Sequence, residues 1–108
     1  MSETSEIIEV TTTTASEVEA QTIARQLVSQ RLAACVQVAG PIHSFYRWQG
    51  ELCEAQEMRL TIKSLSRVQA PLIAALKAIH SYETPEIVVV TGIECSAEYA
   101  QWLGEQID

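Results

Sequence analysis

One stretch decides the fold: residues 32–65, which read LAACVQVAGPIHSFYRWQGELCEAQEMRLTIKSL. Apolar and polar side chains alternate over residues 57–63, which is the period of a strand with one buried face and one wet face. The first half is apolar but breaks at Gly40 and Pro41. Because proline cannot donate to a ladder, the break predicts a bulge or bend on an edge strand. Residues 46–51 form the predicted turn of a long hairpin.

Two further strands and three helices are predicted around this hairpin. The strands are residues 7–13 and residues 86–93, which are rich in β-branched side chains. A first helix begins at Ser16, because Glu19 stands after it at the spacing of a capping box. Its apolar stripe follows helical spacing and consists of Ala20, Ile23, Ala24, Leu27, Val28 and Leu32.

The second helix has two competing start positions. Ser66 has a glutamine at the same capping distance, but Pro71 favours a start nearer Ala70. The stripe of this helix consists of Val68, Leu72, Ile73, Leu76 and Ile79. Residues 80–85 end it. A short third helix begins at Ser96 and carries on one side Tyr99, Trp102 and Leu103.

The order of these elements predicts an α+β fold. Two split βαβ units give a ferredoxin-like βαββαβ sandwich, with helices on one face of an antiparallel sheet and one additional C-terminal helix. Strands two and four then lie at the sheet edges, where an apolar run such as residues 87–90 is a hazard if left bare. We therefore expect a homo-oligomer. The 108 residues suit a single domain, residues 1–108, with a frayed start at residues 1–5.

Composition narrows the classes of function. The net charge is −7, from 14 acidic and 7 basic residues, and Lys and Arg do not cluster, so we expect no nucleic-acid or membrane partner. Neither a signal peptide nor a transmembrane run is apparent, and three widely spaced cysteines suggest no disulfide framework, so we expect a cytoplasmic protein. Without a nucleophile elbow or a Gly-rich phosphate loop, we expect neither an enzyme nor an organic cofactor.

Three segments resemble the CutA family of divalent-cation tolerance proteins. Residues 31–36, RLAACV, resemble its helix-to-strand signature, and residues 46–50, YRWQG, resemble its hairpin turn. Residues 80–87, HSYETPEI, resemble its His-Pro-Tyr-Glu-x-Pro-Glu segment. The resemblance implies a ferredoxin-like trimer, in which hairpins and edge strands of neighbouring subunits complete one another's sheets. It also implies a role in tolerance to copper and other divalent cations.

The chain departs from the family pattern at two positions. Ser81 stands where the family motif has proline. Thr12 matches a cysteine that has been proposed as a copper ligand in some members. Since a hydroxyl is a poor copper ligand beside a thiolate, a cysteine-based copper site does not carry over to this chain.

The candidate metal ligands are His80, Glu83 and Glu86. Imidazole suits copper and zinc, and one histidine with carboxylates would hold Cu²⁺ or another divalent cation weakly and reversibly. For each of these three residues, a role without metal binding stays open. His80 is otherwise a cap at the helix end, where the dipole favours a cation. Glu83 is otherwise a solvated loop residue, and Glu86 is otherwise the partner of a basic group such as Arg31 or Lys63.

The candidate residues of an inter-subunit cleft or interface are Tyr46, Arg47, Trp48 and Tyr82. Aromatic side chains at a hairpin tip are costly to expose, so packing against a neighbouring subunit is their simplest use. Two alternatives to metal tolerance remain. One is a sensor like the PII-type signalling trimers, binding a small organic anion or nucleotide if Arg47, Arg59 or Lys63 converge. The other is a structural trimer scaffold with no direct metal role.

Overall fold

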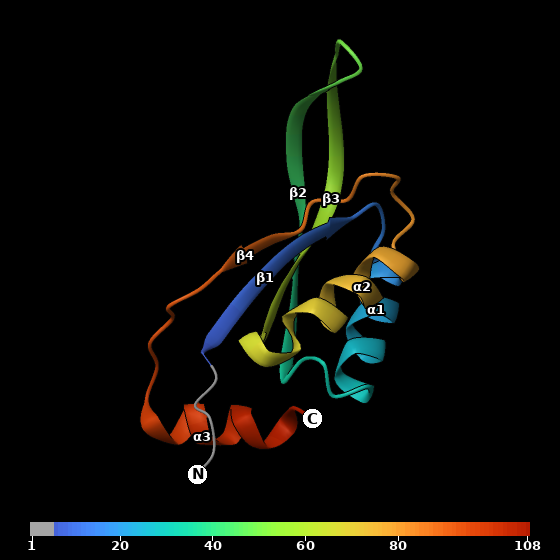
Figure 1. The fold of residues 1–108 in the computed structure, drawn as a ribbon. Helices are drawn as coiled ribbons and strands as arrows, with labels where there is room; N and C mark the ends of the chain where they lie inside the picture. The colour runs from blue at the N-terminus through green and yellow to red at the C-terminus, as the bar shows by residue number, and fades with distance from the viewer. Residues whose placement is uncertain (1–5) are drawn as a thin grey trace.

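The computed structural model describes residues 6–108 and is built on one four-stranded antiparallel sheet. The sheet order is β2-β3-β1-β4, and the strands are β1 (Ile7–Thr14), β2 (Cys35–Trp48), β3 (Glu51–Leu65) and β4 (Val88–Val90). Two helices, α1 (Glu17–Ser29) and α2 (Gln69–Ile79), cover one face of the sheet (Figure 1). A third, α3 (Ala97–Gln106), lies at the end of the sheet away from the hairpin tip. The frayed start predicted at residues 1–5 lies outside the described residues.

Two buried clusters hold the layers together. The larger one joins the helix-facing side of the sheet to α1 and α2, and it includes Ile8, Val10, Leu60, Ile62, Ile23, Leu27, Leu72 and Leu76. The smaller one lies beneath α3 and contains Ala34, Leu65, Val68, Leu103 and Ile107. As predicted, β2 and β4 are the edge strands.

Serine caps begin two of the helices as predicted. Ser16 Oγ accepts a hydrogen bond of 3.1 Å from the Glu19 N–H, and Ser96 Oγ accepts one of 3.2 Å from the Tyr99 N–H. The proposed cap at Ser66 is wrong. A single 3₁₀ turn, Ser66–Val68, precedes α2, and the side chain of Ser66 accepts instead from the Glu6 N–H. Starting α2 at Gln69 leaves Pro71 in the first turn, where no intrahelical N–H partner is needed.

Two predicted elements extend too far. The stripe of α1 buries Ala20, Ile23 and Leu27, but Val28 is 44% exposed and Leu32 lies beyond the helix end. The predicted strand 86–93 shrinks to Val88–Val90, because only three residues of β1 pair with it. The apolar run therefore predicted the position of β4 correctly, but it could not predict how many residues of β1 pair with it.

The hairpin overhangs the rest of the sheet. Strand β1 pairs with β3 only as far as Thr14 opposite Met58, whereas β2 follows β3 to its tip (Figure 1). The turn consists of Gln49 and Gly50, both with positive φ, so residues 46–48 belong to the end of β2. This overhang makes the molecule 52 × 24 × 22 Å.

The predicted bulge is confirmed and lies at the root of the overhang. The register shifts between Ala39, which faces Arg59, and Ile42, which faces Glu57. Gly40 and Pro41 therefore stand opposite a single residue, Met58. A bulge bends its strand and redirects nearby side chains, and here it adjoins the pocket described next.

Candidate functional site

A pocket of about 690 Å³ lies where the overhang meets the loop after α2. Strand β2 lines it with three aromatic residues, Phe45, Tyr46 and Trp48. The loop contributes Tyr82, Glu83 and Glu86, and β3 contributes Glu57. This volume lies in the range of about 300–1,000 Å³ that is typical of small-molecule sites.

The structure brings together most of the residues singled out from the sequence. Tyr46, Trp48, Tyr82, Glu83 and Glu86 line this one pocket, whereas Arg47 and His80 do not. Among the residues that line it, none is basic. The convergence of Arg47, Arg59 and Lys63 that an anionic ligand would need is therefore not found at this pocket.

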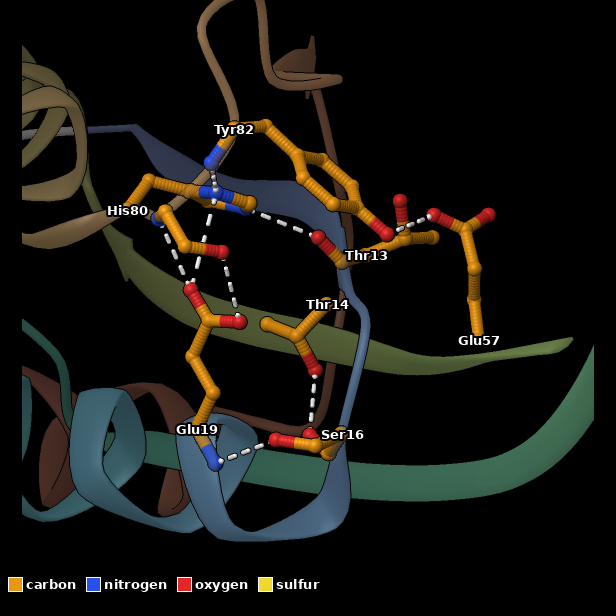
Figure 2. Close-up of polar contacts among 8 residues, drawn as sticks. Thr13, Thr14, Ser16, Glu19, Glu57, His80 and Tyr82 are labelled. Atoms are coloured by element: carbon orange, nitrogen blue, oxygen red, sulfur yellow. Dashed lines mark hydrogen bonds and ion pairs between the residues drawn. The ribbon is translucent and has the colours of Figure 1, made fainter. Parts of the chain in front are cut away.

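His80 is a buried bridge between the end of α2 and β1. Its side chain is fully buried, and its Nε2 lies 2.8 Å from the Thr13 carbonyl oxygen, which only accepts, so Nε2–H donates. Its Nδ1 accepts from the Tyr82 N–H at 3.1 Å (Figure 2). Both ring nitrogens are thus engaged, Nε2 as a donor and Nδ1 as an acceptor. Only the backbone of His80 caps α2, donating to the Leu76 carbonyl; the ring reaches β1.

Glu19 holds the loop from the other side. Its carboxylate accepts the Ser81 N–H at 2.9 Å and the Ser81 hydroxyl at 3.0 Å. The His80 Nδ1 is 3.8 Å from the same carboxylate, but because Nδ1 accepts from the Tyr82 N–H it has no hydrogen to donate there. The sequence pattern predicted Glu19 only as a helix-cap residue. The proline of the family motif would supply neither donor, so Ser81 replaces it with two hydrogen bonds.

Glu57 is a site residue that the sequence pattern missed. Strand alternation placed it on the wet face, yet only 8% of it is exposed, and it accepts a 2.7 Å hydrogen bond from the Tyr82 hydroxyl (Figure 2). Burial works to raise the pKa of its carboxyl, but hydrogen bonds from Ser44, Tyr82 and Thr13 outweigh burial and lower that pKa. The only sequence signal was its place next to Met58, the residue opposite the Gly40–Pro41 break.

Tyr82 complements the ionised Glu57. Burial, followed by the hydrogen bond and the charge of Glu57, raises the pKa of the Tyr82 hydroxyl, so the hydroxyl stays protonated and donates. The ring of Tyr82 also lies against the His80 ring, with centroids 4.9 Å apart. His80 thus fixes the backbone of Tyr82, and Glu57 fixes its hydroxyl.

Glu83 and Glu86 are exposed at the edge of the pocket, and the basic partners proposed for Glu86 are engaged elsewhere. Arg31 Nε lies 3.1 Å from Asp108, and Lys63 donates to Gln37 at 2.9 Å. Within residues 6–108, no group of three or more His, Cys, Asp and Glu side chains is arranged to hold a metal ion. His80, Glu83 and Glu86 therefore do not form a closed metal site in one chain.

The sequence and the fold both match known proteins. The family model of the CutA1 divalent ion tolerance protein matches residues 8–106. The chain belongs to the CutA1 family. The family predicted from three short segments is thereby confirmed.

CutA relatives are similar over most of their length. The chain is 45% identical over 93 residues to the divalent-cation tolerance protein CutA of Thermus thermophilus, covering 86% of this chain and 90% of the relative. It is 34% identical over 103 residues to CutA of Yersinia pestis, covering 95% of this chain and 87% of that relative.

CutA structures share the fold. The Thermus thermophilus CutA1 structure has a TM-score of 0.91 at 42% identity and covers 94% of this chain and 99% of that one. The rice CutA1 structure has a TM-score of 0.93 at 29% identity, and the match covers 99% of this chain and 98% of that one. An Archaeoglobus fulgidus structure with 33% identity is described as a periplasmic CutA. In residues 6–108 of this chain, no helix has the length and apolarity needed to cross a membrane.

Proposed function

We propose that this CutA1 protein acts in divalent-metal tolerance by binding Cu²⁺ or a similar cation weakly and reversibly, and that it is not an enzyme. Family membership supports the tolerance role. The observation that carries the binding role is the charge of the pocket, which is lined by Glu57, Glu83 and Glu86 and by no basic residue. Glu83 and Glu86 are exposed and supply carboxylate oxygens, which suit divalent cations.

His80 has a conditional part in this proposal. Its imidazole becomes a ligand only if Nδ1 gives up the Tyr82 N–H or Nε2 gives up the Thr13 carbonyl. Two carboxylates without the imidazole make a weak site, in keeping with reversible binding.

Calorimetric titration of chelator-treated protein with Cu²⁺ and Zn²⁺ tests this proposal. We expect the double variant Glu83→Gln/Glu86→Gln to bind at least about tenfold more weakly, or about 1.4 kcal/mol. The matched control is Glu94→Gln/Glu98→Gln, which removes the same charge from exposed positions outside the pocket. Equal binding by both double variants would contradict the proposed ligands. Weaker binding by His80→Gln would add the imidazole to the site, and unchanged binding would leave it as a bridge.

We also infer a ferredoxin-like homotrimer that works in the cytoplasm. Exposed apolar side chains on both edge strands support self-association: Val88 and Val90 on β4 are about half exposed, as are Tyr46 and Trp48 on β2. The free thiols of Cys35, Cys53 and Cys95 are in keeping with a reducing compartment.

The volume and aromatic wall of the pocket support a second function, a trimeric small-ligand sensor. Occupation of the pocket would alter contact with another protein. A ligand that raises the melting temperature of the natural chain, but not of Trp48→Leu, would support this function. A trimer that no metal or small ligand stabilises would instead favour a structural scaffold.

A further inference from the structure

We propose that the pocket binds organic ammonium cations, in which a positively charged nitrogen is attached to a small apolar body. This inference rests on the pocket being a small-ligand site, the second function proposed above, and does not depend on metal binding. It assigns the chemical class of the ligand from the side chains that face the pocket.

Aromatic rings form much of the pocket wall. Tyr46 and Trp48 come from β2, and Tyr82 comes from the loop after α2. Side chains alternate along β2, so Tyr46 and Trp48 share the face of Glu57, whereas Phe45 lies on the other face. In the single chain, Tyr46 is 45% exposed and Trp48 is 43% exposed, so their rings are open to a ligand. The faces of aromatic rings attract cations, and sets of such rings recognise substituted ammonium groups.

One buried carboxylate complements these rings. Glu57 accepts from the Tyr82 hydroxyl through Oε2. Its lowered pKa keeps it ionised at neutral pH, with no basic side chain among the pocket residues to balance it. A charge so placed attracts a cation more strongly than an exposed one, because less water screens it. Exposed Glu83 and Glu86 add to the negative potential at the edge.

The same features disfavour an anion and a tightly held metal ion in this pocket. An anion would meet three carboxylates and no positive group in this pocket. A tightly held metal ion needs several converging ligands, and residues 6–108 contain no group of three that could serve. An organic ammonium ion needs only a diffuse negative field, ring faces and space. A volume of about 690 Å³ supplies that space.

The test uses choline as the probe and 3,3-dimethylbutanol as its matched control, since that alcohol has the same shape with carbon in place of nitrogen. Trp102→Phe leaves Trp48 as the only tryptophan, so its fluorescence reports the pocket. We expect choline to change this fluorescence in a saturable way. We expect the uncharged alcohol to bind at least about tenfold more weakly.

Calorimetry on variants then assigns the binding to the pocket. Glu57→Gln keeps acceptor and shape but removes the charge, and Trp48→Leu removes a ring face; each should weaken choline binding about tenfold. Glu54→Gln, on the exposed face of β3, is the matched control and should bind like the natural chain. Circular dichroism checks that each variant folds, and light scattering checks that each variant keeps the mass of the natural chain. If Glu57→Gln is unfolded, Glu83→Gln/Glu86→Gln replaces it and should weaken binding in the same direction.

Three outcomes would overturn the inference. Equal affinity for choline and the alcohol would leave a small-ligand pocket that does not recognise charge, so the second function would survive. Choline binding that neither Glu57→Gln nor Trp48→Leu weakens would place the binding elsewhere on the chain. Absence of binding by either compound would remove both the inference and this support for a ligand sensor, while the copper titration would still decide the metal role.

Discussion

Two buried threonines on β1 differ in one hydrogen bond. Thr12 and Thr14 are both fully buried, and Thr14 Oγ1 donates to the Ser16 carbonyl at 2.8 Å. Among the described residues, the Thr12 hydroxyl is buried without a partner. We expect Thr12→Val to raise the free energy of unfolding by about 1 kcal/mol. The reason is that the buried hydroxyl loses its hydrogen bonds to water on folding and gains no partner in the protein. Urea unfolding at fixed protein concentration measures this change in stability.

Thr14→Val is the matched control for this prediction. The same change of atoms there removes a hydrogen bond that is made, so the free energy of unfolding should fall by about 1 kcal/mol. A loss of stability in Thr12→Val equal to that in Thr14→Val would mean that the Thr12 hydroxyl has a partner in solution.

Glu57 makes stability depend on pH. Its folded pKa lies below the ordinary value of 4.5, so its contribution is fully present above the unfolded pKa and is lost as pH falls through the folded pKa. We expect the natural chain to lose more stability than Glu57→Gln between neutral pH and acid below pH 4.5. Urea unfolding across this range provides the measurement. Parallel curves for the two proteins would show that the hydrogen bonds to Glu57 do not favour its charged form.

Site residues that lie close together in the sequence were predicted, whereas a site residue whose partner is distant in the sequence was missed. Tyr82, Glu83 and Glu86 belong to one short segment, so a local pattern was enough to single them out. Glu57 lies 25 residues from its partner Tyr82, and its burial depends on a loop that covers it. Strand alternation reports which face a residue occupies, but it does not report what packs over that face.

The bulge in β2 depends on a glycine. Gly40 has φ +145°, and an added Cβ would lie 3.0 Å from the backbone oxygen of Glu57. We expect Gly40→Ala to lower the free energy of unfolding by about 1–3 kcal/mol. Alanine would have to adopt a strained positive φ, and its Cβ would crowd the backbone oxygen of Glu57 on the paired strand. Thermal or urea unfolding measures this effect.

Gly104→Ala provides the opposite control. Gly104 lies within α3, and an added Cβ would meet nothing within 4 Å. Alanine there should raise stability by about 0.5–1 kcal/mol through helix propensity. Gly40→Ala without a loss relative to the natural chain would show that the bulge relaxes at low cost.

At the level of elements, local chemistry was the reliable guide. Ser16 and Ser96 were predicted as helix caps because a cap is made within three residues of sequence. Ser66 has the same pattern but bonds to Glu6, a partner 60 residues away. Strand β4 was predicted too long for a related reason, since its length is set by its pairing with β1.

The two tryptophans offer a test of assembly at the scale of the whole molecule. Trp48 on the overhang and Trp102 on α3 are almost equally exposed, at 43% and 42%. If the hairpin packs on neighbouring subunits, Trp48→Ala should shift the mass from trimer toward monomer at low concentration, and Trp102→Ala should not. Light scattering after size-exclusion chromatography measures the mass. An unchanged trimer for Trp48→Ala would exclude Trp48 as an anchor of the interface.

The long overhang also makes cleavage by a protease sensitive to assembly. Arg47 is exposed one residue before Trp48, near the tip of a two-stranded arm that no third strand covers in the described chain (Figure 1). Trypsin cleaves after arginine, and an isolated arm can fray far enough to enter its active site. A separated subunit would be nicked at this bond, whereas an arm laid along its neighbours would be shielded. The rate of this single cut would therefore record how often a subunit is alone.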